Sequence, residues 1–297
     1  MTRAAIAFVE RRYREALSLC ERGARICRTR HVGTTWEIAN LELCAVSTLA
    51  CLGEMAPMRA RMIDLLQRAD EHGDLYSAVS LRIGLPSLCW LASGEPDEAR
   101  REVAHARASA SLAPFQEYLA VYAESHIDLY AGDPAAAWER IGIAWPGFRK
   151  SFVLRVQGVR IDLVDLRARC ALALLAREPA PRPGRARLMR VVRLAAWRLE
   201  RERVAAAAPV TAALRAGLAW QRGDRATAIP YLIEAAAGFE RIDMRAHAAA
   251  ARLHLAGAGE GESVERCAEV MRALGVADPV RYAATLLPGT AGAAALP

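Results

Sequence analysis

The stretch Gly223-Asp224-Arg225-Ala226-Thr227-Ala228-Ile229 contains the pattern that decides the fold. It has a Gly, an acidic residue, and then an Ala followed by a bulky or long residue. The same motif recurs at residues 94–100 and 132–138, and weaker copies occur at 11–17, without the Gly, and at 53–59, without the Ala. A period of about 40 residues with two helices per unit is typical of a helical solenoid.

The residue types of the motif suit a turn between two helices. Gly can end a helix in the left-handed conformation, and Asp or Glu can cap the N-terminus of the next helix. We expect the Ala to lie where two helices cross, because its side chain is small. Each helix pair would leave one apolar face uncovered, so the units must stack to be stable.

Composition supports an all-α fold. Of the 297 residues, 54% are hydrophobic, and Ala, the best helix former, supplies many of them. No alternating apolar run bounded by turn residues indicates a strand. We predict a right-handed α-solenoid of about seven antiparallel helix pairs, forming one continuous domain over residues 1–287.

The predicted helix boundaries follow the apolar periodicity and the Gly and Pro positions. The pairs are 3–10 with 13–28, 35–52 with 57–72, 75–92 with 96–110, 115–131 with 134–143, 152–177 with 185–203, 206–222 with 226–241, and 244–255 with 262–274, followed by a short helix at 278–287. Residues 178–184 hold three Pro and are expected to form a joint. The tail, 288–297, is expected to be disordered.

The pattern resembles the tetratricopeptide repeat family in a degenerate form. The resemblance lies in Tyr13-Arg14-Glu15-Ala16-Leu17, in Leu218-Ala219-Trp220-Gln221-Arg222-Gly223-Asp224 and in Leu232-Ile233-Glu234-Ala235-Ala236. The spacing is nearer 40 residues than the 34 of that family, which favours an irregular superhelix. The resemblance implies a scaffold that binds proteins or peptides.

A second resemblance lies near the end of the chain, in Leu274-Gly275-Val276-Ala277-Asp278-Pro279-Val280-Arg281-Tyr282, closing in Leu286-Leu287-Pro288-Gly289. It is similar to the C-terminal repeat region of large signalling proteins of myxobacterial type, which have a Ser/Thr kinase domain and often an ATPase module. This resemblance implies that the chain is a portion or a relative of such a regulator.

Catalytic motifs are not found in the sequence. The single Lys, Lys150, stands in Gly147-Phe148-Arg149-Lys150-Ser151, which lacks the spacing of a phosphate-binding loop, and no kinase motif is present. The six His and seven Cys show neither a zinc-binding spacing nor a Cys-x-x-Cys pair. We therefore predict a protein that is not an enzyme and has no cofactor or metal; any kinase or ATPase activity would belong to a domain outside this chain.

The sequence indicates a soluble chain. Charged residues interrupt the N-terminus before a signal sequence develops, and the longest uncharged internal stretch, residues 83–94, has 12 residues. That length is too short to cross a bilayer. We expect a cytoplasmic protein that does not bind membranes.

Positive charge is concentrated in one segment. Residues 149–203 hold 15 Lys and Arg against 5 Asp and Glu. On the helix predicted from 185, the stripe Leu188, Val192, Ala195 and Leu199 is apolar, and Arg side chains fall beside it. These are Arg187, Arg190, Arg193, Arg198 and Arg201. They form either a solvated face or a site for an anionic partner: an acidic protein segment, a phosphorylated chain or nucleic acid.

Tyr122, His126 and Tyr130 form a stripe at helical spacing. The stripe either belongs to the core or contacts a ligand on the concave face.

Three functional hypotheses follow. The first is a non-catalytic scaffold or regulatory module that binds a protein or peptide, the second is a module that binds anions or nucleic acid through residues 149–203, and the third is a small-molecule sensor on the concave face.

Overall fold

The computed structural model describes residues 1–30, 33–177 and 182–290. These residues form helices and turns and no strand, which confirms the all-α class. In chain order the helices are α1 (Thr2–Val9), α2 (Tyr13–Arg30), α3 (Thr35–Leu52), α4 (Met55–Glu71), α5 (Leu75–Arg82), the 3-10 turn η1 (Leu85–Ser87), α6 (Leu88–Ala92), α7 (Pro96–Ser109), α8 (Pro114–Tyr130), α9 (Pro134–Lys150), the 3-10 turn η2 (Phe152–Arg155), α10 (Gln157–Arg177), α11 (Arg182–Glu200), α12 (Ala207–Trp220), α13 (Arg225–Arg241), α14 (Arg245–Gly257), α15 (Val264–Ala273) and α16 (Pro279–Leu286).

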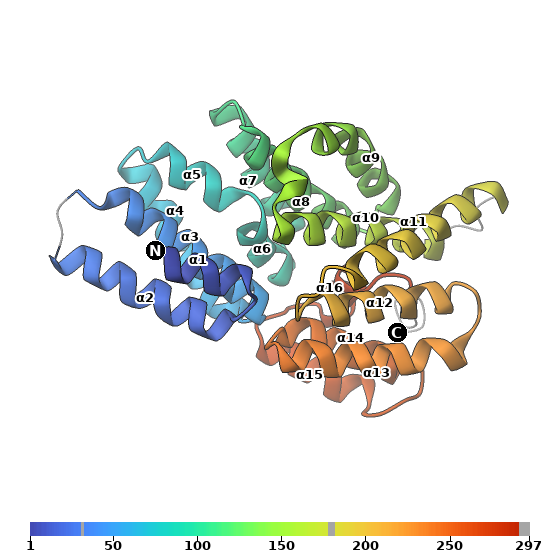
Figure 1. Ribbon diagram of the computed structural model, residues 1–297. Coiled ribbons are helices and arrows are strands. Elements are labelled where there is room, and N and C mark those ends of the chain that lie inside the picture. The colour runs from blue at the N-terminus through green and yellow to red at the C-terminus, as the bar shows by residue number, and fades with distance from the viewer. Residues whose placement is uncertain (31–32, 178–181, 291–297) are drawn as a thin grey trace.

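Most helices pack against their neighbours along the chain, and the chain as a whole curves back on itself. Figure 1 shows the N-terminal helices in blue on the left, α7 to α10 in green above, and α11 on the right. The orange and red helices α12 to α16 return below and reach the blue helices. Contacts of α14 with α3 and of α16 with α8 join segments far apart in the sequence.

The repeat motif forms the turns between helices, much as the sequence predicts. Its glycines adopt φ angles of 77° to 78° at Gly53, Gly94, Gly132 and Gly223. Asp133 and Asp224 cap the following helix by accepting a hydrogen bond from the backbone N–H three residues on. The capping role expected for the acidic residue is wrong where that residue is Glu: Glu54 and Glu95 make no such bond, because the longer side chain is a poorer cap.

The Ala of the motif is buried where the helices meet. Ala99, Ala137 and Ala228 have no exposed surface, and Met58 is equally buried in the copy that lacks the Ala. In the first copy, Arg11 stands where the other copies have Gly, and it adopts the left-handed conformation with a φ of 62°. This conformation is unusual for a residue with a side chain, and the contacts of Arg11 described below explain it.

Three predicted helix boundaries differ from the structure. The helix predicted over 75–92 is interrupted at Gly84, which has a φ of 71° and donates its N–H to the carbonyl of Leu119 at 3.0 Å. Pro86 follows in η1 and lacks the N–H that would continue the helix. The helix predicted over 152–177 begins with the separate turn η2, and the one predicted to end at 143 continues through Pro146 to Lys150.

The two ends of the array are joined by backbone contacts. Met55 donates its N–H to the carbonyl of Leu274 at 2.9 Å, and Ala277 donates to Ala92 at 2.7 Å. A Cβ on Gly53 would come within 2.5 Å of the backbone nitrogen of Ala246. The segment from Leu274 onward therefore packs against the N-terminal helices, which nearest-neighbour stacking alone does not produce.

The expected tail and joint are partly wrong. Residues 288–290 are buried: Gln221 donates to the carbonyl of Gly289 at 3.1 Å, and Thr290 donates to Leu287 at 3.0 Å. These contacts hold the start of the predicted disordered tail in the core, and 291–297 lie outside the described residues. Of the predicted joint at 178–184, residues 182–184 belong to α11, and 178–181 lie outside the described residues.

Two glycine substitutions test the contact between the ends. Gly53 and Gly223 share a φ of 77°, but no atom lies within 4 Å of a Cβ built on Gly223. We expect Gly223→Ala to lower the free energy of unfolding by about 1 kcal/mol, the cost of a left-handed Ala. Gly53→Ala should cost about 1–3 kcal/mol more, because the added methyl meets backbone. Urea denaturation measures both, and equal losses would contradict the close packing of the two ends.

Candidate functional site

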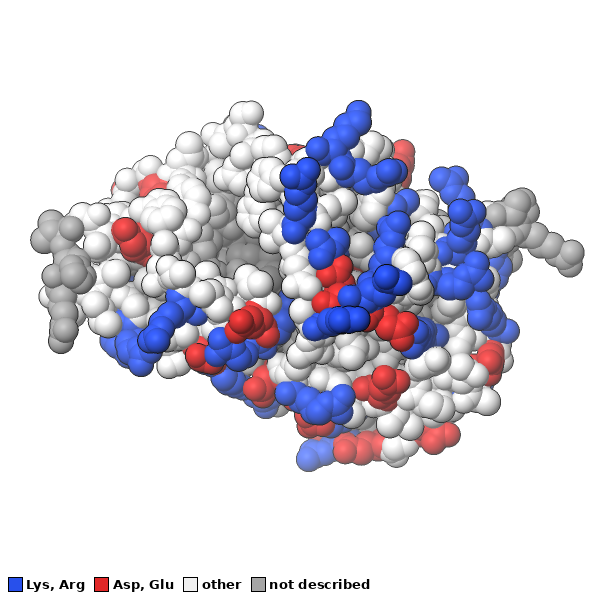
Figure 2. Space-filling view, viewed as in Figure 1, with Lys and Arg blue, Asp and Glu red and all other residues white. Residues whose placement is uncertain are grey.

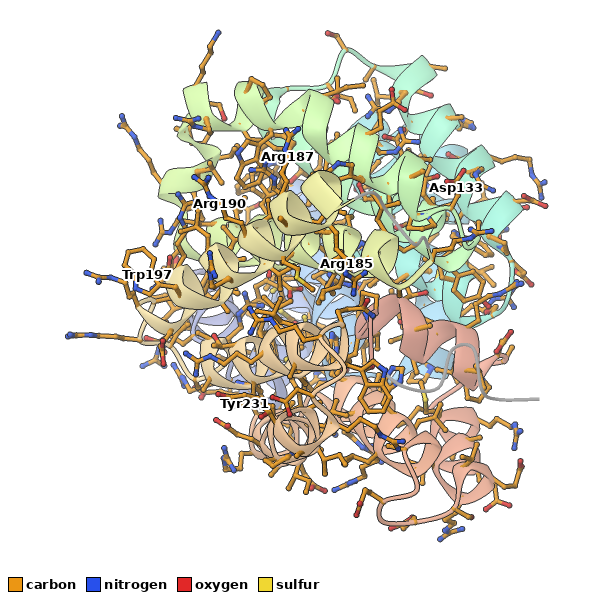
Figure 3. All side chains as sticks on the ribbon, turned by 90° about the vertical axis from the view of Figure 1, so that its right-hand side faces the viewer. Asp133, Arg185, Arg187, Arg190, Trp197 and Tyr231 are labelled. Atoms are coloured by element: carbon orange, nitrogen blue, oxygen red, sulfur yellow. The ribbon has the colours of Figure 1, made fainter. Side chains whose placement is uncertain are left out.

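A groove with a volume of about 1080 Å³ runs between α11 on one side and α9, η2 and α10 on the other. The apolar stripe of α11, comprising Leu188, Val192, Ala195 and Leu199, is buried as predicted. Because these residues fix which face of α11 is covered, the Arg side chains beside them border the groove. Figure 3 shows Arg187 and Arg190 on the side of α11 that faces α9 and α10, with Trp197 farther along the helix.

Most of the arginines that line the groove have no ionic partner among the described residues. Arg187, Arg190, Arg198 and Arg201 line it as the sequence suggests, and α9 and α10 add arginines of their own, Arg149 and Arg167. None of these six forms a salt bridge or donates a side-chain hydrogen bond to another described residue. Arginines crowd the right-hand part of the face seen in Figure 2.

The carboxylate that lines the groove is already neutralised. Glu202 accepts hydrogen bonds from Nε and Nη2 of Arg160 at 2.6 and 2.7 Å, and a further one from Gln157 at 3.2 Å. The hydrogen bonds from Arg160 lower the pKa of Glu202, and they outweigh the burial of the carboxylate, which raises it. The remaining groove arginines therefore present uncompensated positive charge.

Arg193 does not belong to this groove, although the sequence grouped it with the others. It borders a separate hollow formed with α12 and α13, near Tyr231 and the Arg215–Glu200 ion pair. A helix turns by about 100° per residue, so Arg187 and Arg193, which are six residues apart, lie about 120° apart around α11, and Arg193 faces α12 and α13 instead of the groove. The five arginines that the sequence places beside the apolar stripe therefore do not all line one groove, since Arg193 borders the other hollow.

The site also includes Arg167, Arg149 and Trp145, which the sequence pattern does not single out. The Arg167 guanidinium lies 4.2 Å from the ring centroid of Trp145, a contact that stabilises a cation over an aromatic face. Arg201 lies in the same way 4.8 Å from the Trp197 ring. The charge excess of residues 149–203 was the available signal, but it does not reveal which arginines of α9 and α10 face α11.

Apolar side chains accompany the charges. Leu194 and Trp197 keep 41% and 51% of their surface exposed at the groove, while Val164 lies buried in its floor. A surface of this kind can contact both the charged groups and the apolar groups of one ligand. A solvated Arg face has no need of exposed apolar side chains, so their presence favours a binding surface.

Tyr122, His126 and Tyr130 are buried, which favours the core alternative over contact with a ligand on the concave face. Tyr122 and His126 border an internal cavity of about 70 Å³, which the C-terminal segment helps to enclose through Tyr282 and Leu286. Tyr130 lies elsewhere, with Arg281 5.4 Å from its ring centroid. The array is closed on its inner side, and these rings form part of its core.

The charged groups around the cavity are paired with each other. Arg169 donates to Asp165 at 2.7 Å, to the carbonyl of Thr285 at 3.2 Å and to Nε2 of His126 at 3.0 Å. Because Arg can only donate, Nε2 of His126 accepts, and its Nδ1 donates to the carbonyl of Tyr122 at 2.8 Å. Burial, then the charge of Arg169, holds the pKa of His126 well below its usual value.

Arg11 completes the cavity wall. Its guanidinium donates to Asp162 at 3.1 Å and to the Tyr13 hydroxyl at 2.8 Å. The side chain therefore connects the first inter-helix turn to α10, across 151 positions of the sequence. This contact accounts for an Arg in a left-handed position that the other motif copies give to Gly.

Other kinds of site find little support within the described ranges. No three His, Cys, Asp or Glu residues there are placed to hold a metal ion. No single helix among them is long and apolar enough to cross a membrane; α5 with residues 85–92 meets that standard only as a pair bent by 61°.

Comparison with protein-family models, with curated proteins and with solved structures finds no match to this chain. Its function therefore has to be argued from the groove and the fold themselves.

The histidines at the cavity predict a dependence of stability on pH. Burial, then the charges of Arg169 and Arg11, lowers the pKa of His247 to about 3, whereas an unfolded His titrates near 6.5. Between these values the unfolded chain binds the extra proton. The free energy of unfolding should therefore fall as the pH drops below about 6.5, by up to about 1.4 kcal/mol per pH unit for this residue.

Urea denaturation between pH 4.5 and 5.5 tests this expectation. His247→Leu should reduce the pH slope by about 1.4 kcal/mol per unit. Phe239→Leu is the control, since Phe239 packs 5.1 Å from the His247 ring and its loss removes packing while keeping the titrating group. An unchanged slope in His247→Leu would show that this His is not held neutral by the fold.

Proposed function

We propose that this chain is a non-catalytic helical-repeat module that binds an acidic segment of a partner protein in the groove between α11 and α9–α10. The observation that carries the proposal is the set of six groove arginines without ionic partners among the described residues. Elsewhere, arginines at comparable helix interfaces are paired, as Arg107 is with Glu117 and Glu124.

The dimensions of the groove suit an extended peptide. Residues 186–199 of α11 border it, and this length of helix spans about 20 Å. An extended chain covers that distance with about six or seven residues. Leu194 and Trp197 would contact apolar side chains of such a segment, and the arginines its carboxylates.

Nucleic acid is less well supported as the partner. Single-stranded nucleic acid binds to basic grooves largely by stacking bases on aromatic rings. In this groove a guanidinium already covers one face of Trp145 and one face of Trp197. No helix-turn-helix or other reading motif accompanies the groove, and a protein segment is therefore the preferred ligand.

The proposal also includes the repeat arrangement of the helices and a relation to bacterial signalling proteins. A tetratricopeptide-like, right-handed array of about seven helix pairs agrees with the motif turns and with the packing of successive helices. The relation to repeat regions of Ser/Thr kinase or ATPase signalling proteins rests on residues 274–289, the part of the chain that closes the array. We propose a regulatory role in the cytoplasm on this basis.

A labelled hexapeptide with four Glu and two Leu tests the function, with the same peptide carrying Gln for Glu as its control. We expect salt-sensitive binding of the Glu peptide to the wild-type chain in fluorescence anisotropy, because exposed charges are screened by salt. The triple variant Arg187→Glu, Arg190→Glu, Arg201→Glu should bind at least tenfold more weakly.

A variant of equal net charge provides the matched control. Arg3→Glu, Arg25→Glu and Arg222→Glu alter three exposed arginines that lie outside the groove, and these changes should leave binding within about twofold, since distant surface charges are screened. Equal binding of the Gln peptide would refute the proposal. Tighter binding of a single-stranded oligonucleotide, lost in the groove variant, would assign the groove to nucleic acid instead.

A further inference from the structure

Arg167 is a part-buried arginine that forms no ion pair with a described residue. Its Nε is buried and has no hydrogen-bond partner among those residues, as is true of Arg59 and Arg82, but these two arginines are paired with Glu95 and Asp70. Its guanidinium is stacked against Trp145 and lies 5.8 Å from the centroid of Trp138. Stacking holds the planar group in place at the groove, so that less freedom is lost when it binds a ligand.

The charged groups that shift the pKa of Arg167 are all positive. Burial lowers the pKa of Arg167, and the positive charges of Arg198, Arg187 and Arg149 lower it further. Every other arginine with a shifted pKa in the described part of the chain has it raised, because a carboxylate lies nearby, as for Arg82, Arg107 and Arg169. The groove and the hollow beside it contain Glu202, which is held by Arg160, and Glu139, which forms no ion pair.

Four guanidinium groups near one another are unfavourable unless an anion lies between them. A single carboxylate would compensate one charge. A phosphate monoester has a charge of about −1.5 to −2 at neutral pH and three acceptor oxygens, and the planar fork of Arg binds two of these oxygens at once. Of the common anionic groups of proteins, a phosphorylated side chain best matches this cluster.

We propose that the cluster of Arg167, Arg187, Arg198 and Arg149 is a phosphate-binding site, which takes the phosphorylated Ser or Thr side chain of a peptide lying in the groove. This proposal rests on the proposed function and narrows it from acidic segments to phosphorylated ones. The exposed Leu194 and Trp197 lie farther along the same groove and would contact residues flanking the phosphorylated side chain.

Three peptides of identical sequence, with phosphoserine, Ser or Glu at one central position, provide the test by fluorescence anisotropy. The wild-type chain should bind the phosphoserine peptide at least tenfold more tightly than either of the others. Arg167→Gln should remove this preference, and Arg167→Lys should remove most of it, because an ammonium group keeps the charge and loses the fork. Inorganic phosphate at millimolar concentration should compete with the phosphoserine peptide.

Two further variants separate the site from general effects. Arg187→Gln removes an exposed member of the cluster without touching the Trp145 stack, and it should also reduce the preference for phosphate, which keeps the test valid if Arg167→Gln is unstable. Arg201→Gln, at the other end of the groove, should weaken all three peptides equally. Circular dichroism and thermal unfolding verify that each variant is folded.

The outcomes distinguish the two proposals. Equal affinity for the phosphoserine and Glu peptides would refute the phosphate site and leave the acidic-peptide groove intact. No binding of any of the three would refute both. If inorganic phosphate inhibits binding of the phosphoserine peptide equally in wild type and in Arg167→Gln, the anion binds elsewhere. That result would overturn the assignment to Arg167.

Discussion

The close packing of the C-terminal segment against the N-terminal helices is the constraint on which the rest of the structure depends. Gly53 approaches Ala246, and Gly275 approaches Ala56, at distances that leave no room for a side chain on either glycine. The hydrogen bonds of Met55 and Ala277 cross the same interface. Because these contacts are between backbones, the two ends can meet only in this register, and the array becomes a closed body with a filled interior.

Closure decides where ligands can bind. The inner side, which open helical arrays use for recognition, is occupied here by residues of the chain itself, including Tyr282 and Leu286. The rings of Tyr122 and His126 accordingly serve the core. The function proposed above therefore uses the outer surface, where the groove beside α11 combines arginines that are unpaired among the described residues with exposed apolar side chains.

Helix α10 separates the interior from the groove and shows how charge is divided between them. Asp162, Asp165 and Arg169 recur at helical spacing on the side that faces the cavity, and there each charge is paired. Arg160 and Arg167 lie on the side that faces the groove, where Arg167 has no carboxylate partner in the part of the chain that the structure describes. Buried charges are stable only when paired, whereas a cation at an open groove can remain unpaired until an anion binds.

The sequence by itself determined what depends on neighbours within a few turns. It determined the helices, the Gly turns of the repeat motif, the buried stripe of α11 and the concentration of Arg in one segment, because these follow from local propensity and helical periodicity. Only the tertiary structure decided what depends on distant residues. The break at Gly84 follows its contact with Leu119, the role of Arg11 follows from Asp162, and Arg167 joins Arg187 and Arg198 across a groove that no spacing along the chain encodes. Such contacts depend on how the two ends of the chain pack together, and they cannot be predicted from local periodicity.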